Sequence, residues 1–345
     1  MGEILVGLAG YGVGGAVFHA PLLEVTLGLR LAAVATSRRE GVEQALPGAR
    51  VTATYRELIA DPTLGLIVVS TPTASHFEIA KAALESGKNV VVDKPFTTTA
   101  AEAGELIALA RRRGLLLSVY QNRRWDGDFL TVERLVKEGQ LGHVYHYESH
   151  FDRFRPRIKG GWRDEEGAGS GILYDLGAHL IDQALRLFGL PRAVWAEAMA
   201  QRPEARSVDY FHVVLDYGRL RAILHGASVV REPGPRFAVH GDGGSFLKSG
   251  MDPQEDALRA GARPGAAGWG EDSPENYGLL VRAEGERQRV RTAAGSYTSY
   301  YDGIARALLE GSPVPVDPAD SRDGLRVIEA ASKSAAEGRR VTLTD

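Results

Sequence analysis

The sequence predicts an α/β protein with two domains. Residues 1–121 are expected to form a doubly wound parallel sheet, and residues 122–345 an α+β domain with an open, mostly antiparallel sheet. Up to residue 121, short and wholly apolar segments alternate with amphipathic ones, which is typical of buried parallel strands joined by helices. Beyond it, strands with single-residue alternation pair through glycine turns, which indicates antiparallel hairpins. A length of 345 residues also exceeds one ordinary domain.

The composition is that of a soluble globular protein and excludes several classes of function. The formal net charge is −3 and no long basic run exists, so nucleic acid is not expected as a partner. The absence of cysteine excludes disulfides, thiolate catalysis and cysteine-ligated metals. No apolar run reaches membrane-spanning length, and the first residues lack the basic start of a signal peptide. We therefore expect a cytoplasmic protein without membrane contact.

The chain starts with an apolar strand over Ile4–Ala9, a glycine-rich turn and a helix. The turn consists of Gly10, Tyr11, Gly12, Val13, Gly14 and Gly15. Its first, third and sixth residues fit the glycine pattern of dinucleotide-binding turns. In that pattern the first glycine permits the tight turn, the second lets the backbone approach a pyrophosphate, and the third allows close helix–strand packing. A glycine-rich turn without a ligand is the alternative.

The second strand, over Leu29–Ala35, has no acidic residue at its end. Sites that prefer NAD carry an Asp or Glu there, which binds the ribose hydroxyls. This chain instead continues with Thr36, Ser37, Arg38 and Arg39. Hydroxyls beside guanidinium groups suit the 2′-phosphate of NADP. We expect NADP as the cofactor, with NAD possible; the alternative is that the two arginines only begin a solvated helix.

Strands and helices continue to alternate as far as residue 121. Strands are expected over residues 51–53, 66–69, 89–92 and 115–119, and helices over residues 76–86 and 99–113. Gly87 and Gly114 would end these helices, and Thr98 or Thr99 would cap the second one. The six strands complete the predicted parallel sheet.

Polar residues follow the fifth of these strands abruptly, as Asp93, Lys94 and Pro95. Ligands of open α/β sheets bind outside the carboxyl ends of the strands, so Lys94 would face whatever the sheet binds. The plainer interpretation is a solvent-exposed lysine at the end of a strand.

The second domain opens with a polar segment at Gln121–Asp126 and a helix over residues 129–138. Strands are expected over residues 143–150, 211–217, 220–225, 237–240 and 245–247. Residues 251–276, rich in glycine and proline, are expected to be an excursion from the core. Helices can cover only one face of such a sheet. We therefore expect a homo-oligomer, a dimer or a tetramer, that uses the other face.

A second polar cluster lies in the segment 173–182. In a helix, Asp175, His179 and Asp182 would share one face, because they recur at i, i+4 and i+7. A histidine between two carboxylates could act as a proton acceptor. The same residues could instead form a buried polar network or contribute two metal ligands.

Taken together, these motifs resemble the family of glucose–fructose oxidoreductase, inositol dehydrogenase and rhizopine catabolism proteins (Gfo/Idh/MocA), along essentially the whole chain. The resemblance rests on the glycine turn, Ser70–Thr73 with His76, Asp93-Lys94-Pro95, Trp162-Arg163, and Asp175 with His179. Members most often have Glu where this chain has Asp93. Segments Phe18–Leu22, Asn122–Phe129 and Phe151–Pro156 are similar to the branch that contains NADP-dependent scyllo-inositol dehydrogenases.

The resemblance implies hydride transfer between a nicotinamide and a polyol or sugar hydroxyl, with a scyllo-inositol-like substrate favoured. His179 would accept the hydroxyl proton, Lys94 would hydrogen-bond the reacting oxygen, and Asp175 would hold the substrate or the imidazole. A cis Lys94–Pro95 peptide is also implied. No metal is expected, because two acidic partners without further His or Cys make a thin ligand set. The expected cofactor contacts are Gly10, Tyr11, Gly12, Val13, Gly14, Gly15, Thr36, Ser37, Arg38, Thr71, Pro72, His76, Asp93, Lys94, Asn122, Arg124, Trp162 and Arg163. A core aromatic is the alternative for Trp162.

Two other functions remain open at this point. A reductase acting on a keto-sugar or an aldehyde would use the same residues in the reverse direction. A non-catalytic NAD(P)-binding sensor could lose Lys94 or His179, and the chain retains both.

Overall fold

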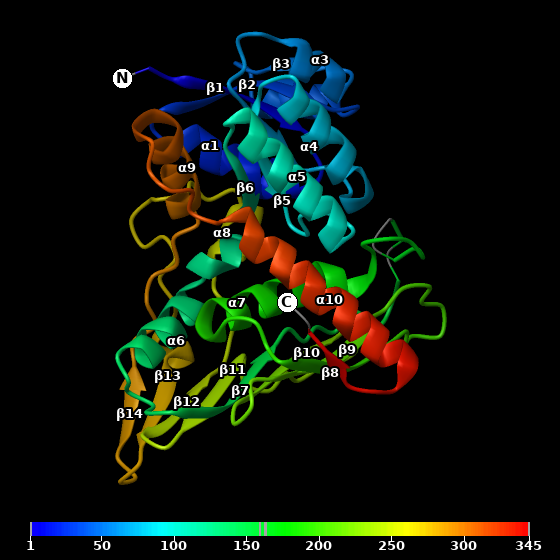
Figure 1. Cartoon of the computed structure of the whole chain (residues 1–345). Coiled ribbons are helices and arrows are strands. Elements are labelled where there is room, and N and C mark those ends of the chain that lie inside the picture. Colours follow the sequence, from blue (N-terminus) through cyan, green and yellow to red (C-terminus); the bar gives the residue numbers. More distant parts are fainter. Residues whose placement is uncertain (1, 159, 162–163, 344–345) are drawn as a thin grey trace. The chain divides into compact units, whose positions relative to one another are not determined.

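The structure is a computed structural model, and it describes residues 2–158, 160–161 and 164–343 (Figure 1). The chain divides into two compact units. The first comprises residues up to Asn122 together with 254–269 and 296–322, and the second comprises 123–253, 270–295 and the residues from Asp323 onward. Two segments of the continuous second domain predicted from the sequence thus lie in the first unit. Helices α8 (Gln254–Arg259) and α9 (Thr298–Glu310) pack there against η1 (Gly14–His19) and α1 (Ala20–Val25).

Six parallel strands form the sheet of the first unit, sheet A, within the described residues. Their order is β3-β2-β1-β4-β5-β6, as expected of a doubly wound sheet. The strands are β1 (Ile4–Ala9), β2 (Leu29–Ala35), β3 (Arg50–Thr52), β4 (Leu66–Val69), β5 (Asn89–Asp93) and β6 (Leu117–Tyr120). Helices α1 and α9 lie on one face, and α4 (His76–Glu85) and α5 (Ala100–Arg113) on the other (Figure 1). Because both faces are covered, the strands are almost wholly apolar.

Two shorter helices, α2 (Arg39–Ala45) and α3 (Tyr55–Ala60), complete the alternation. The caps of α5 follow the sequence-based expectation. The Thr99 hydroxyl accepts a hydrogen bond from the Glu102 backbone, and the Glu102 carboxylate accepts one from the Thr99 backbone, which forms a capping box. Gly114 ends the helix with a φ of 64°.

The second unit contains a nine-stranded sheet, sheet B, in the part of the chain that the structure describes. Its order is β14-β13-β12-β11-β7-β10-β9-β8-β15, and every pair is antiparallel except β7 with β10. The strands are β7 (Val144–His150), β8 (Ala193–Met199), β9 (Tyr210–Asp216), β10 (Arg221–Ala227), β11 (Phe237–Gly241), β12 (Gly244–Lys248), β13 (Gly278–Arg282), β14 (Arg287–Val290) and β15 (Val341–Thr342). The predicted open, mostly antiparallel sheet is confirmed, although β8, β13, β14 and β15 were not predicted.

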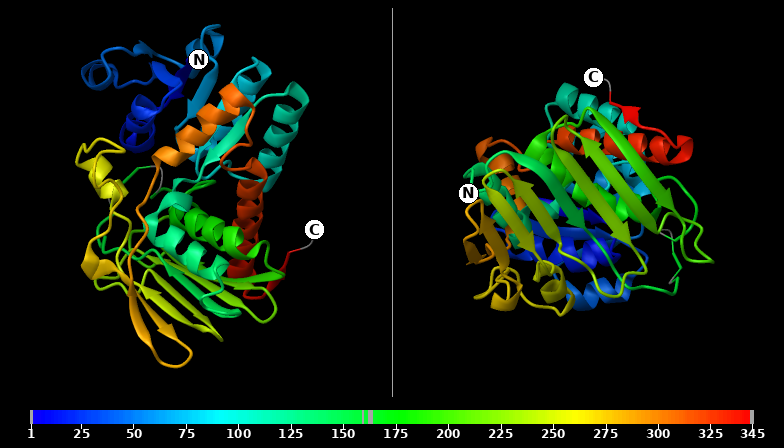
Figure 2. Two further views of the ribbon diagram at one scale, coloured as in Figure 1. Left: turned by 90° about the vertical axis from the view of Figure 1, so that its left-hand side faces the viewer. Right: turned by 90° about the horizontal axis from the view of Figure 1, so that it is seen from below.

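In the residues that the structure describes, helices cover only one face of sheet B. They are α6 (Gly127–Lys137), α7 (Ala178–Phe188) and α10 (Pro318–Glu337), and the right-hand view of Figure 2 looks onto the opposite, uncovered face. The side chains of β7 alternate accordingly: Tyr147 and Ser149 are buried, whereas His146, Glu148 and His150 point to the other side and are partly exposed. We call this second side the open face.

Residues 251–276 are not the excursion that the sequence predicts. They contain α8, in which Gln254 and Leu258 are buried. The Gln254 side-chain oxygen accepts hydrogen bonds from the Tyr297 backbone (2.7 Å) and the Trp269 indole (2.9 Å). A single buried amide thus ties this segment to the chain that precedes α9. The glycines and prolines of this segment, which suggested a loop, lie in the turns around the helix.

None of the helices in the described residues combines the length and the apolar character that crossing a bilayer requires.

Candidate active site

The glycine turn joins β1 to η1, and its glycines are held in different ways. A Cβ placed on Gly10, whose φ is +100°, would lie 2.4 Å from the Ser70 carbonyl oxygen. One placed on Gly15 would lie 2.2 Å from the Gly10 carbonyl oxygen. A Cβ on Gly12, by contrast, would meet no atom within 4 Å. The outer two glycines therefore permit internal packing, whereas the middle one leaves backbone open to a ligand, and this arrangement fits a dinucleotide pyrophosphate.

The end of β2 presents hydroxyl and guanidinium groups. The Arg38 backbone donates a hydrogen bond to the Thr36 hydroxyl (3.0 Å), which fixes the start of the loop. Arg39 pairs with Glu43 one helical turn further on (3.2 Å). Ser37 and Arg38 are exposed. The loop can therefore offer a hydroxyl and a bidentate donor to a phosphate group.

Asp93, at the end of β5, is held by donors from three segments. The Ser70 hydroxyl donates to one carboxylate oxygen (3.0 Å) and the Lys94 backbone donates to the other (2.8 Å). His19 Nε2 lies 3.4 Å from the first oxygen. Burial would raise the pKa of Asp93, but the hydrogen bond and charge of His19, with the charges of Lys94 and His76, outweigh it and lower the pKa to about 2. Asp93 is thus ionised and fixes the backbone of Lys94.

His19 is a site residue that sequence reasoning did not identify. Its ring is fully buried, with Nδ1 2.6 Å from the Tyr301 hydroxyl and its centroid 4.4 Å from that of Tyr120. It links Asp93 to α9, which is distant in sequence. The signal that could have identified His19 lies in the segment Phe18–Leu22. This segment carried part of the family resemblance, but its histidine was given no role.

His76 connects the loops that follow β4 and β5. One ring nitrogen lies 2.8 Å from the Thr71 carbonyl oxygen and the other 2.8 Å from that of Pro95. Burial lowers the pKa of His76, while the nearby Asp93 and these carbonyl contacts act in the opposite direction. The Lys94–Pro95 peptide is cis, which confirms the sequence-based expectation. Thus His76 joins the backbones on which Thr71 and Lys94 lie.

In the second unit, Asp175 and His179 lie where a π-helical turn continues into α7. Asp175 belongs to η4 (Leu173–Gly177) and is half-buried, whereas His179 is in the first turn of α7 and is buried. The carboxylate of Asp182 forms a bidentate pair with Arg124, at 2.8 and 2.7 Å. This pair explains why Asp182 can be buried. It also gives the Arg124 guanidinium a structural contact, whereas the sequence predicted a cofactor contact for Arg124.

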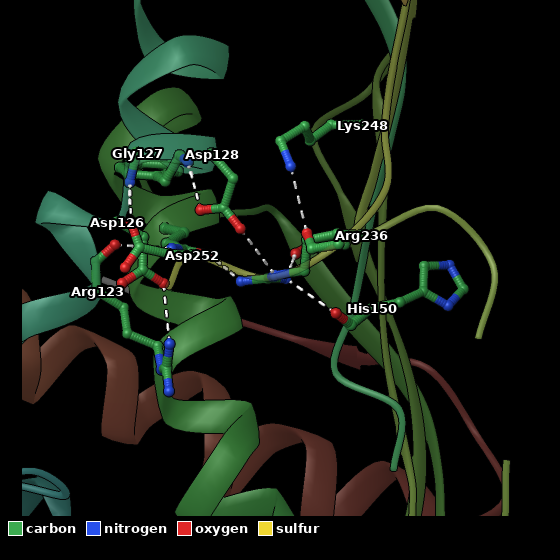
Figure 3. A network of polar contacts seen from close by, with 12 residues as sticks. Arg123, Asp126, Gly127, Asp128, His150, Arg236, Lys248 and Asp252 are labelled. Carbon is green, nitrogen blue, oxygen red and sulfur yellow. Dashed lines mark hydrogen bonds and ion pairs between the residues drawn. The ribbon is translucent and has the colours of Figure 1, made fainter. Parts of the chain in front are cut away.

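A buried polar network beneath sheet B fixes the position of α7 further (Figure 3). The Gln183 amide donates to the Arg123 carbonyl oxygen (2.9 Å) and its oxygen accepts from Arg236 (3.1 Å). Arg236 also donates to the Ser149 hydroxyl (2.6 Å) and lies 3.6 Å from the Asp128 carboxylate. Because these groups are almost fully buried, the helix that carries His179 has little freedom to rotate.

The predicted site residues are therefore distributed over both units. The first unit contains the glycine turn, the β2 loop, Thr71, Pro72, His76 and Lys94, and it ends at Asn122. Of these residues, Lys94 is half-buried, Pro72 is exposed and Asn122 is buried. Asp175 and His179 lie in the second unit. Trp162 and Arg163 fall outside the described residues. That Lys94 and His179 converge on one cleft stays a prediction.

Comparison with known proteins shows the family of the chain. Residues 4–121 match the domain described as "Oxidoreductase family, NAD-binding Rossmann fold", and residues 133–343 match "Oxidoreductase family, C-terminal alpha/beta domain". The chain is 46% identical to scyllo-inositol 2-dehydrogenase (NADP(+)) IolW of Bacillus subtilis, over 99% of this chain and 96% of the relative. It is also 46% identical to the uncharacterized oxidoreductase YdgJ of Escherichia coli, with 96% of each chain covered.

A solved structure agrees with these matches. The oxidoreductase yvaA of Bacillus subtilis superimposes with a TM-score of 0.97 at 45% identity, over 99% of both chains. Three observations indicate the same family: the two matched domains, the identity along the whole length, and the glycine turn at the carboxyl edge of a parallel sheet. The chain belongs to the Gfo/Idh/MocA family of oxidoreductases, with an NAD-binding Rossmann domain.

Proposed function

We propose that the protein is an NADP-dependent dehydrogenase that oxidises a ring hydroxyl of a cyclic polyol, with scyllo-inositol as the favoured substrate. The observation that carries this proposal is the 46% identity, over 99% of the chain, to a relative named for that activity. The loop after β2 supports the cofactor choice independently. It carries no acid in Thr36–Arg39, and it exposes Ser37 and Arg38.

The residues at the carboxyl edge of sheet A fit a bound dinucleotide. The open backbone at Gly12 would receive the pyrophosphate, and Ser37 and Arg38 the 2′-phosphate. Thr71 and His76 would border the nicotinamide half, since both follow β4 at the carboxyl edge of sheet A and contact each other. When bound, the nicotinamide supplies the hydride acceptor.

The chain's own residues handle the proton and the charge of the reacting hydroxyl. His179 accepts the hydroxyl proton, and general base catalysis of this kind raises the rate by roughly 10²- to 10⁴-fold. The Lys94 ammonium donates a hydrogen bond to the same oxygen and stabilises its developing negative charge. Asp175 holds the substrate or the imidazole of His179. Asp93 positions Lys94 through the main-chain contact described above.

The open face of sheet B is proposed to pair with a second copy of the chain. Trp195 and Met199 on β8 belong to this face and are 37% and 44% exposed. Light scattering at micromolar concentration should give at least a dimer, and Trp195→Glu should weaken it because a charge would be buried. A monomeric wild-type protein would refute this pairing.

A panel of polyols and sugars, including scyllo- and myo-inositol, tests the proposed activity when it is assayed separately with NADP⁺ and NAD⁺. We expect the highest kcat/KM for scyllo-inositol with NADP⁺. Tight NADPH binding with negligible turnover of every polyol would instead favour a sensor. Efficient reduction of an unrelated keto-sugar, with no polyol oxidised, would favour a reductase.

A further inference from the structure

The open face of sheet B carries a continuous row of alternating histidines and carboxylates. Its five members are His146, Glu148, His150, Asp152 and His225, which we call the open-face row. The first three are on β7, Asp152 follows that strand, and His225 is on the neighbouring β10. Figure 3 shows the His150 ring on the opposite side of the strands from Arg236 and the buried network. The row has no part in the proposed activity.

Three members of this row converge. His225 Nδ1 lies 2.8 Å from one Asp152 oxygen, and His150 Nδ1 lies 3.4 Å from the other. One ligand atom from each of the three residues falls within 4.8 Å of the other two. In a tetrahedral zinc site with bonds of about 2.0–2.1 Å, neighbouring ligand atoms are about 3.3 Å apart. The two nitrogen–oxygen distances, 2.8 and 3.4 Å, are thus close to the separation that one ion requires, and the third pair of donors lies within 4.8 Å.

We propose that His150, Asp152 and His225 bind a divalent transition metal ion, with Zn²⁺ as the best fit. Two imidazoles and one carboxylate suit Zn²⁺ and its neighbours, whereas Mg²⁺ and Ca²⁺ prefer oxygen ligands. A fourth position would be left for water. The absence of a metal expected from the sequence concerned the catalytic cluster, and this site is in a different place.

The surroundings of the three residues resemble those of a prepared metal site. His150 turns its second nitrogen, Nε2, toward Glu148 (3.2 Å), so the ring lies between a carboxylate and the metal position. Metal-binding histidines usually have such an outer carboxylate, which fixes the ring and increases its basicity. Glu148 is itself held by His146, at 2.6 Å.

The backbone also fixes Asp152 beside β10. Phe151 donates its backbone hydrogen bond to the His225 carbonyl oxygen (2.8 Å), and Arg153 donates to that of Ala227 (2.9 Å). Asp152 is therefore anchored on both sides to the strand that provides His225. In the unpaired chain its side chain is 5% exposed, and those of His225 and His150 are 16% and 24% exposed, so an ion can reach the two imidazoles before the open face pairs with a second copy.

The test is calorimetric titration of the full-length, tag-free and chelator-treated protein with ZnCl₂. We expect saturable binding of one Zn²⁺ per chain. Glu148→Gln should weaken it by roughly 10- to 100-fold, the usual effect of losing an outer carboxylate. His225→Gln should weaken it further. The matched control is His240→Gln, because His240 lies on the same face and contacts Ser245 outside the site. Its affinity should equal that of the wild type.

Co²⁺ provides a measurement that needs no variant. One equivalent added to the wild-type protein should produce the visible absorption of a tetrahedral site, and Zn²⁺ should remove it. Absence of saturable Zn²⁺ binding to the wild type would overturn the proposal. Equal losses in His225→Gln and His240→Gln would also overturn it, since they would indicate scattered surface binding. Circular dichroism of each metal-free variant checks that the fold is retained.

Discussion

The loops at the carboxyl edge of sheet A and the open face of sheet B both place histidines against an aspartate, yet in opposite surroundings. At the first, His19 is fully buried and Asp93 accepts from Ser70 and the Lys94 backbone. At the second, Asp152 lies between two histidines that keep part of their surface exposed. Both aspartates have a pKa lowered to about 2.

The difference shows that a lowered pKa does not by itself reveal what a carboxylate does. Burial acts to raise the pKa in both places and is outweighed in both by the neighbouring histidines. The carboxylate oxygens of Asp93 accept hydrogen bonds from internal donors, including the main chain, so Asp93 positions its neighbours. Asp152 faces imidazole nitrogens that an incoming ion could share. Accessibility of the partners therefore separates a positioning role from a binding role.

The largest expected effect is a loss of turnover when residues of the proposed active site are replaced, with no loss when the open-face row is altered. Lys94→Ala should lower kcat by roughly 10²- to 10³-fold, because a preorganised donor to the reacting oxygen is lost. His179→Ala should lower it by roughly 10²- to 10⁴-fold. The affinity for NADPH, measured by fluorescence titration, should change far less in either variant. Asp152→Asn, in the other region, should keep wild-type turnover. Full activity of the Lys94 or His179 variant would show that its assigned role is wrong.

The cofactor loop should respond next most strongly. Arg38→Ala should raise the KM for NADP⁺ by roughly ten- to a hundredfold, since one charge-assisted hydrogen bond contributes about 1.5–3 kcal/mol. The KM for NAD⁺ should hardly change, because NAD⁺ has no 2′-phosphate. Arg39→Ala is the matched control, since Arg39 pairs with Glu43. Equal wild-type efficiency with the two cofactors would mean that the loop does not select between them.

Asp93→Asn tests the buried cluster by stability and pH. A pKa of about 2 in the folded state, against 3.8 in the unfolded chain, corresponds to about 2 kcal/mol of stabilisation at neutral pH. Because the folded pKa is the lower one, this contribution is complete above about pH 5 and is lost as the pH falls from about 4 toward 2. Urea unfolding of wild type and variant should therefore give a difference that shrinks below about pH 4. A difference independent of pH would contradict the assignment.

Sequence reasoning located the first region because topology alone determines it. The apolar run that ends at Asp93 and the glycine turn after Ala9 both mark carboxyl ends of strands, which meet at one edge of a parallel sheet. His19 escaped the same reasoning. Its contact with Tyr301 spans 282 residues and depends on α9 joining the first unit.

The second region could not be derived in this way. The pairing of His225 with Asp152 spans 73 residues and requires β10 to lie parallel to β7 in one particular register. Alternation along a strand indicates which side chains share a face, but it does not say which strand is the neighbour. Strands β8, β13, β14 and β15 also stayed unpredicted. Asp182 likewise lies on the predicted helix, yet its Arg124 partner comes from a distant segment.

The smallest expected effect is that of His225→Gln on the stability of the metal-free protein. The substitution removes one of the two imidazoles beside Asp152, but the glutamine amide can still donate to the carboxylate. A hydrogen bond between side chains contributes about 0.5–1.5 kcal/mol net, and the amide replaces part of the one that is lost. We therefore expect urea unfolding at neutral pH to give a loss below about 1 kcal/mol, less than for Asp93→Asn. A loss as large as that of Asp93→Asn would mean that the open-face row is a structural network like the buried cluster. A small loss without metal, together with a stabilisation by Zn²⁺ that only the wild type gains, would distinguish a binding site from a structural one.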